Sequence, residues 1–209
     1  VRAIRNGENI SYTADKVIMT IPPRLMTQNI AFDPPLEDSK IQLLNAIPTW
    51  MAGHCKLVFI YQQPFWREQG LSGEVFSHCG PLTEIYDASA DSGDLFALTS
   101  FVGLSVRQRQ QMGIEKIKQV CLNQLQQLFG DNALRVLEIR ITDWSGEIYT
   151  TTEMDLSTAA QHPEFPSDLA RSFCDNRVIM AGTETARNHG GYLEGALESA
   201  EEALSLLSD

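Results

Sequence analysis

The sequence predicts an α+β fold, on three observations. Strand and helix patterns are mixed along the 209 residues without the strict alternation of a doubly wound sheet. The clearest helix pattern, residues 113–130, has apolar positions at a spacing of three to four, and strand patterns at 83–86, 95–102 and 135–143 surround it. No G-x-G-x-x-G occurs, so a complete dinucleotide-binding half is absent from the sequence.

The first residues are expected to form β structure. Asn6-Gly7 separates two short strand-like segments, 1–5 and 10–13, and this dipeptide is the strongest signal for a two-residue hairpin loop. Residues 15–21 predict a further strand. Pro22-Pro23 should end it, because proline cannot donate to a sheet ladder.

The middle of the chain predicts one short helix and one central strand. Residues 36–47 have a helical pattern that Pro48 ends. Residues 56–61 are apolar almost throughout, which is typical of a strand covered on both faces. Residues 64–66, Pro-Phe-Trp, predict an aromatic turn.

The C-terminal part predicts a buried strand, a glycine-rich turn and a helix. The strand, 178–181, stops at Gly182, and Gly190 and Gly191 permit close approach of the backbone to a neighbouring group. Such a turn at a helix N-terminus can hold an anion or a cofactor atom, or it can be purely structural. The helix begins near Tyr192. Its expected buried face comprises Leu193, Ala196, Leu197, Ala200, Ala203, Leu204 and Leu207.

The composition excludes several classes of function. The net charge of −11 disfavours a nucleic-acid-binding surface and favours cations such as amines. No run approaches the roughly 20 apolar residues of a membrane span. The cysteines and the four histidines form no ligand-spaced cluster, so no metal site is predicted. Without a signal peptide or a disulfide pattern, a cytoplasmic location is expected. The cysteines are Cys55, Cys79, Cys121 and Cys174.

Two motifs near the C-terminus resemble a known family. Ala181-Gly-Thr-Glu-Thr-Ala186, followed by Gly191-Tyr-Leu-Glu-Gly-Ala196, is similar to the C-terminal flavin-binding segment of the flavin-containing amine oxidases, the monoamine and polyamine oxidase family. Further similar stretches follow the family's order across nearly the whole length. They are residues 12–23, 30–36, 47–61, 63–66, 72–73 and 143–150.

The resemblance implies a division into domains. Residues 1–23 and 144–209 would belong to a Rossmann-like FAD-binding domain whose N-terminal half is missing. Residues 24–143 would form a substrate-binding domain, a mixed β-sheet flanked by helices. Since the missing half should bind the pyrophosphate, this chain alone is expected to bind FAD weakly and to lack oxidase activity.

The resemblance also implies roles for single residues. Glu184 would bind the ribityl or phosphate region of FAD, and the backbone of Tyr192 and Leu193 would face the flavin pyrimidine oxygen. The Tyr192 ring would form one wall of an aromatic cage for the amine. Lys56 would contact flavin N5 through a water, and Trp144 lies in the stretch that returns to the flavin. The remaining predicted cofactor-binding residues are Gly182, Thr183 and Gly191.

Each of these residues also has a simpler interpretation. Lys56 begins an apolar strand, where a lysine is usually the solvated end of the strand. Tyr192 is equally consistent with a half-buried aromatic residue at a helix start, and Trp144 with a core residue.

Two positions depart from the family pattern. Where monoamine oxidases carry the cysteine linked to the flavin, this sequence has Glu153 with no cysteine near it in sequence, so FAD should be non-covalent. The second aromatic of the cage falls at about Met154, which leaves the cage incomplete.

The implied reaction is oxidation of an amine to an imine, with electrons passing to flavin and then to O₂. The partners are thus an amine substrate and O₂, and a homodimer is one option for assembly. Two alternatives stay open. One is another flavin oxidoreductase of the superfamily, of the protoporphyrinogen or carotenoid type, and the other is a non-catalytic fragment that serves binding or oligomerisation.

Overall fold

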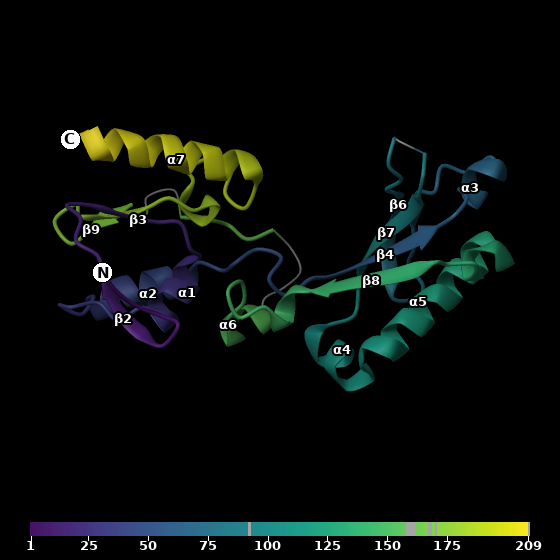
Figure 1. Ribbon diagram of the computed structural model, residues 1–209, viewed down its shortest axis with the longest axis horizontal. Coiled ribbons are helices and arrows are strands. Elements are labelled where there is room, and N and C mark those ends of the chain that lie inside the picture. Colours follow the sequence, from purple (N-terminus) through teal and green to yellow (C-terminus); the bar gives the residue numbers. More distant parts are fainter. Residues whose placement is uncertain (92, 158–161, 167–168, 170, 209) are drawn as a thin grey trace. The chain divides into compact units, whose positions relative to one another are not determined.

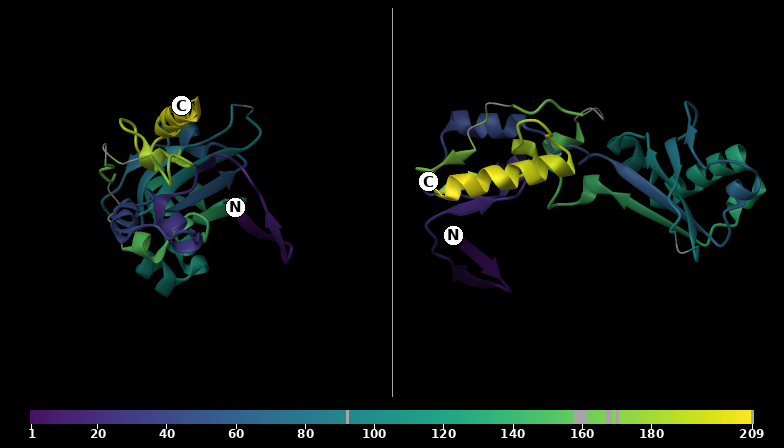
Figure 2. Two further views of the ribbon diagram at one scale, coloured as in Figure 1. Left: turned by 90° about the vertical axis from the view of Figure 1, so that its left-hand side faces the viewer. Right: turned by 90° about the horizontal axis from the view of Figure 1, so that it is seen from above.

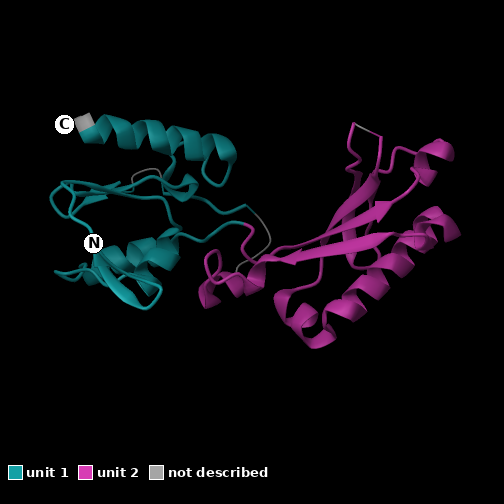
Figure 3. Cartoon of the chain, viewed as in Figure 1, with its two compact units in different colours: residues 1–50, 161–209 teal, residues 51–160 magenta. Residues whose placement is uncertain are grey.

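A computed structural model describes residues 1–91, 93–157, 162–166, 169 and 171–208 (Figure 1). The chain divides into two compact units (Figure 3). Unit 1 comprises Val1–Trp50 and Gln161–Asp209, and unit 2 comprises Met51–Ala160. The division into a flavin domain and a substrate domain, expected at 23/24 and 143/144, stays a prediction.

Unit 1 begins with a β-hairpin. Strands β1 (Arg2–Arg5) and β2 (Glu8–Ser11) pair antiparallel. Asn6 and Gly7 have φ of 53° and 83°, the left-handed conformations that a type I′ loop needs, so the predicted hairpin is confirmed. Figure 2 shows the hairpin standing apart from the other elements of unit 1, in agreement with its exposed residues.

A three-stranded sheet joins the two sequence segments of unit 1. Its order is β3 (Val17–Met19), β10 (Val178–Met180) and β9 (Ser172–Phe173), with β10 parallel to β3 and antiparallel to β9. Both predicted strands, 15–21 and 178–181, are thereby confirmed with shorter bounds. Ile179 is fully buried in the central strand.

Two helices cover one side of this sheet, and α7 lies on the other (Figure 1). They are α1 (Pro23–Asn29) and α2 (Asp38–Ala46). Met26, Leu44 and Met180 form a buried core, which ties both helices to unit 1. The proline pair ends β3 as expected but also starts α1, because the fixed φ of proline suits the first helical position.

The sheet of unit 2 is antiparallel in all its pairings of described strands, not mixed as expected. Neighbouring strands such as β6 and β7 follow one another through short connections, which antiparallel pairing allows. The sheet order is β5 (Val75–Phe76), β6 (Leu82–Asp87), β7 (Phe96–Val102), β4 (Cys55–Tyr61) and β8 (Glu138–Asp143).

One face of this sheet packs against α5 (Ile114–Phe129), the helix predicted at 113–130, which follows α4 (Val106–Met112). Strand β4 buries alternate residues, whereas Val58 and Ile60 between them are only partly buried, so the expected full cover applies to one face. Burial raises the pKa of Cys55 to about 11 and of Cys121 to about 12, which keeps these core thiols protonated.

Short helical segments connect the main elements. The predicted aromatic turn is a helix whose Phe65 and Trp66 are buried, and Trp66 Nε1 donates to Asp87 at 2.7 Å. These segments are α3 (Phe65–Glu68), η1 (Asp131–Leu134), η2 (Trp144–Gly146), α6 (Glu153–Leu156) and η3 (Thr183–Thr185).

The C-terminal helix α7 (Leu193–Ser208) buries a different face from the one predicted. Of the seven expected residues only Ala203 is buried, whereas Leu193 and Leu197 are 90% and 62% exposed. The helix instead buries Gly195 and Ser199. The hydroxyl groups of Ser199 and Thr185 lie 2.9 Å apart, so a polar contact and a small residue set the helix orientation in place of leucine packing.

This orientation predicts that polar substitution of an exposed leucine is tolerated. We expect Leu197→Gln to change the free energy of unfolding by less than about 0.5 kcal/mol. If Leu197 were instead buried against the sheet, the substitution would lower the free energy of unfolding by at least about 2 kcal/mol. Urea unfolding of both proteins distinguishes these cases. Ala203→Gln, at a buried position of the same helix, is the destabilising control.

Candidate flavin-side site

The predicted cofactor residues of unit 1 follow strand β10. Gly182 precedes η3, which carries Glu184 as a buried acid with 8% exposure. Thr185 Oγ1 donates to the Gly182 carbonyl at 2.8 Å and fixes this turn. The carboxyl ends of parallel strands, here β3 and β10, are where open α/β sheets bind cofactors.

The turn is joined to the start of α7. Thr183 Oγ1 donates to the Tyr192 carbonyl at 2.7 Å, so both predicted segments meet within unit 1. The Tyr192 N–H donates to the His189 carbonyl at 3.1 Å. The Leu193 N–H is at the first helical position, where amides have no partner within the helix. Of the two predicted backbone donors, Leu193 is thus the better placed to bind an acceptor atom.

The loop before α7 is held by Glu198, which the sequence did not indicate. Its carboxylate accepts from the N–H groups of Arg187, Asn188 and His189 at 3.0, 3.1 and 3.3 Å. Burial alone would raise the pKa of Glu198, but hydrogen bonds from His189 and these amides lower it below its usual value. An acid inside a helix has no sequence signal for this role, because its partners lie about ten residues earlier.

A buried arginine ties η3 to the same helix. Arg171 donates from Nε to the Thr185 carbonyl at 2.8 Å, and its Nε lies 2.6 Å from Glu202. Arg187 pairs with the other oxygen of Glu202 at 2.6 Å. Burial lowers the pKa of Arg171, and the Glu202 charge opposes that shift. These contacts fix the geometry between the turn and α7.

Four rings surround the two glycines that precede Tyr192; they are Trp50, His162, Phe165 and Tyr192, called the aromatic cluster below. A Cβ on Gly191 would lie 2.9 Å from both His162 Nε2 and Trp50. A Cβ on Gly190 would lie 2.5 Å from the Phe165 ring. The sequence predicts a close approach to these glycines, and the groups that come close are rings of the chain itself.

The other predicted residues, Lys56 and Trp144, belong to unit 2. Lys56 is an exposed residue near the start of β4, paired in register with Thr142. Trp144 follows β8, is 41% exposed, and donates its N–H to the His54 carbonyl at 3.0 Å. Because Cys55 pairs with Asp143, both predicted residues lie at one end of the antiparallel sheet. Trp144 is too exposed to be a core residue.

That end of the sheet is fixed by an ion pair between a buried arginine and a partly buried aspartate. Arg109, only 3% exposed, donates from Nε and Nη2 to the two oxygens of Asp143 at 2.7 and 2.8 Å. It also donates to the carbonyls of Leu104 and Gly53, at 2.6 and 2.7 Å. Burial would raise the pKa of Asp143, but hydrogen bonds from Arg109 and Ser145 hold it below its usual value.

The two positions that depart from the family pattern, Glu153 and Met154, lie in α6 of unit 2. Met154 is 45% exposed. Unit 2 also has a cavity of about 130 Å³ beside Tyr61, at the opposite end of β4 from Lys56. It is smaller than the roughly 300 Å³ at which ligand pockets begin.

Among the described residues, no three His, Cys, Asp or Glu side chains are grouped closely enough to hold a metal ion. In the same part of the chain, no helix has the length and apolarity that a membrane span requires.

Comparison with known proteins identifies the family. The family model described as "Flavin containing amine oxidoreductase" matches residues 1–203. The chain belongs to this family. Curated relatives include the probable flavin-containing monoamine oxidase A of Dictyostelium discoideum and amine oxidase B of Sus scrofa, each 28% identical. The alignments cover 94% and 95% of this chain but only 42% and 40% of those relatives.

Solved structures show the same fold. Putrescine oxidase bound to putrescine matches with a TM-score of 0.75 and 22% identity, over 94% of this chain and 43% of that one. Cyclohexylamine oxidase from Brevibacterium oxydans matches with a TM-score of 0.72 and 22% identity, over 99% of this chain and 45% of that one.

The residues of unit 1 fit a part of a flavin site. The turn after β10 places the buried Glu184 and the helix start together, the arrangement suited to polar groups of a cofactor. The sheet has three strands, with β3 at one edge, and no described element supplies a glycine-rich phosphate loop. These residues would therefore suit only one side of a cofactor.

Proposed function

We propose that this chain is the C-terminal portion of an FAD-dependent amine oxidase that converts an amine to an imine. The observation that carries the proposal is the assembly of residues 182–184 with residues 191–193 by the Thr183 to Tyr192 hydrogen bond. This joins the two family motifs at the carboxyl end of β10. FAD, when bound, would accept the electrons from the amine and pass them to O₂.

The chain's own residues would bind and orient. The buried Glu184 would accept hydrogen bonds from hydroxyl groups of the cofactor, and the Leu193 amide would donate one. The Tyr192 ring, 52% exposed, would attract the cationic amine to its face. Lys56, on the exposed side of β4, would hold a water toward the flavin.

The proposal includes non-covalent FAD, weak binding of FAD by this chain alone, and the assignment of residues 1–23 and 144–209 to the flavin domain. The exposed leucines of α7 support the assignment of this helix to a larger flavin domain, because an apolar helix face needs a further layer of protein. The same surface would serve a homodimer. The four cysteines, all in described parts of the chain, are free thiols, which supports a cytoplasmic location.

An amine panel tests the function. We expect the full-length polypeptide that carries this chain, loaded with FAD, to release peroxide with at least one primary amine or polyamine. Glu184→Gln should weaken FAD binding, and Glu115→Gln, an exposed acid of unit 2, should leave it unchanged.

The alternatives give other results. A protoporphyrinogen- or carotenoid-type enzyme would bind flavin but oxidise no amine of the panel. A non-catalytic binding fragment would bind no flavin even within the full-length polypeptide. Either result would contradict the proposed amine oxidase activity.

A further inference from the structure

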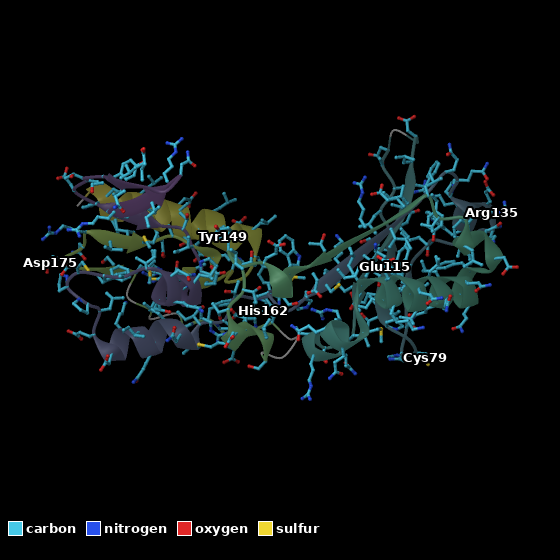
Figure 4. The ribbon with its side chains drawn as sticks, turned by 60° about the horizontal axis from the view of Figure 1, so that its bottom comes forward. Cys79, Glu115, Arg135, Tyr149, His162 and Asp175 are labelled. Carbon is cyan, nitrogen blue, oxygen red and sulfur yellow. The ribbon has the colours of Figure 1, made fainter. Side chains whose placement is uncertain are left out.

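The four rings of the aromatic cluster are not equivalent, because His162 contacts each of the other three. Its ring centroid lies 4.4 Å from Trp50 and 5.7 Å from Phe165, both edge to face. It lies 4.9 Å from Tyr192 with only 14° between the ring planes, a stacked pair. His162, labelled in Figure 4, is the centre of the aromatic cluster.

A hydrogen bond fixes the His162 ring in this place. Its Nε2 lies 2.9 Å from the Gly190 carbonyl oxygen. Since a carbonyl oxygen only accepts, Nε2 carries the proton and donates it. Gly191, at φ 82°, has no Cβ in the space that His162 Nε2 and Trp50 occupy. The imidazole is therefore held by a polar bond at one edge and by ring contacts around it.

This arrangement defines which side of Tyr192 is open. The stacked imidazole covers one face of the phenol ring, and Trp50 meets the same ring edge to face at 5.2 Å. Tyr192 is nevertheless 52% exposed. A cation that binds an aromatic face would thus find one face, in one orientation.

We propose that His162 is a positioning residue that stacks behind Tyr192 and fixes the ring for the amine. The proposal rests on the function proposed above. It assigns His162 no proton transfer, because the imidazole acts through its stacking and its bond to Gly190. Loss of the imidazole should let the Tyr192 ring change its orientation, which weakens amine binding more than the chemical step.

Three variants test this role. His162→Ala removes both the stack and the hydrogen bond, and His162→Phe keeps a stacked ring without the donor. His78→Ala, at an exposed histidine of unit 2, is the control. In the full-length oxidase we expect His162→Ala to raise KM for the amine about 3- to 10-fold, the size expected for losing one aromatic pair. The value of kcat should change less. The KM of His162→Phe should lie close to that of the wild type.

A measurement that does not depend on turnover separates the two proposals. In the NMR spectrum of this chain, the Tyr192 ring protons should carry a ring-current shift that His162→Ala removes and His162→Phe keeps. Unchanged Tyr192 shifts in His162→Ala, or an unchanged KM, would overturn the positioning role. If the wild-type holoenzyme oxidises no amine, the proposed function fails, and the NMR comparison alone decides whether His162 orders Tyr192.

Discussion

Gly195→Ala is expected to lower the free energy of unfolding of unit 1 by about 2 kcal/mol. A Cβ at this position would overlap the backbone carbonyl of His189, lying 2.7 Å from its carbon and 2.8 Å from Thr183 Oγ1. Overpacking against backbone costs up to about 3 kcal/mol. The better helix propensity of alanine offsets only about 1 kcal/mol of this cost, so the clash dominates.

The geometry of the candidate site should change together with the stability of unit 1. Relief of the clash requires α7 to move from the loop at His189, which would stretch the hydrogen bond from Thr183 to Tyr192. Urea unfolding, followed by the fluorescence of Trp50 in unit 1, measures the loss in the free energy of unfolding. Gly146→Ala is the matched control, because nothing lies within 4 Å of a Cβ there. A stability equal to that of the control would show that α7 does not lie this close to His189.

Asp143→Asn is expected to destabilise unit 2 by about 3 kcal/mol. The variant removes the charge that neutralises Arg109, which is 3% exposed, and an unpaired buried charge typically costs 3–5 kcal/mol. We expect the lower end of about 3 kcal/mol because the Asp143 side chain is 29% exposed. Lys56 and Trp144 lie at the same end of the sheet, so their geometry should change as well.

The pH dependence of unfolding gives a second test of this ion pair. The pKa of Asp143 is lower in the folded chain than the roughly 3.9 of an unfolded aspartate, so the pair contributes its full stability above that value. This contribution is lost as pH falls through the folded pKa. The difference between wild type and Asp143→Asn should therefore be constant near neutral pH and shrink below about pH 4.

The exposed pair of Glu138 with Arg140 supplies the control. Glu138→Gln, on the same strand as Asp143, should have little effect on unfolding at neutral pH, because surface ion pairs contribute little. Equal effects of Asp143→Asn and Glu138→Gln would contradict the structural role assigned to Arg109.

Much of the fold could be predicted because its signals are local. Asn6-Gly7 specifies a hairpin by its own backbone preferences, and the periodicity of residues 113–130 specifies a helix. The orientation of α7 could not be predicted in this way. Leu193 and Leu197 form an apolar stripe, but contacts of Ser199 and Glu202 with residues far away in sequence decide which side is buried.

The candidate site likewise has residues that could be predicted from the sequence and residues that could not. The motif containing Glu184 and Tyr192 could be recognised from the sequence, since both halves lie within a few residues of each other. Trp50 and His162 could not, because they lie 142 and 30 residues before Tyr192 and meet it only in the folded chain. Residues 162–166, His-Pro-Glu-Phe-Pro, have two prolines and no helix or strand periodicity, so their sequence gives no hint of the aromatic cluster.

The most direct test of the central claim is a visible absorption spectrum. This chain and the full-length polypeptide that carries it would each be purified with added FAD and separated from free cofactor. We predict the band of bound flavin in the full-length protein, with little or none in this chain, because under the proposed function the chain would supply residues for only one side of the cofactor. A full-length protein without bound flavin would contradict the account and leave only the likeness in fold.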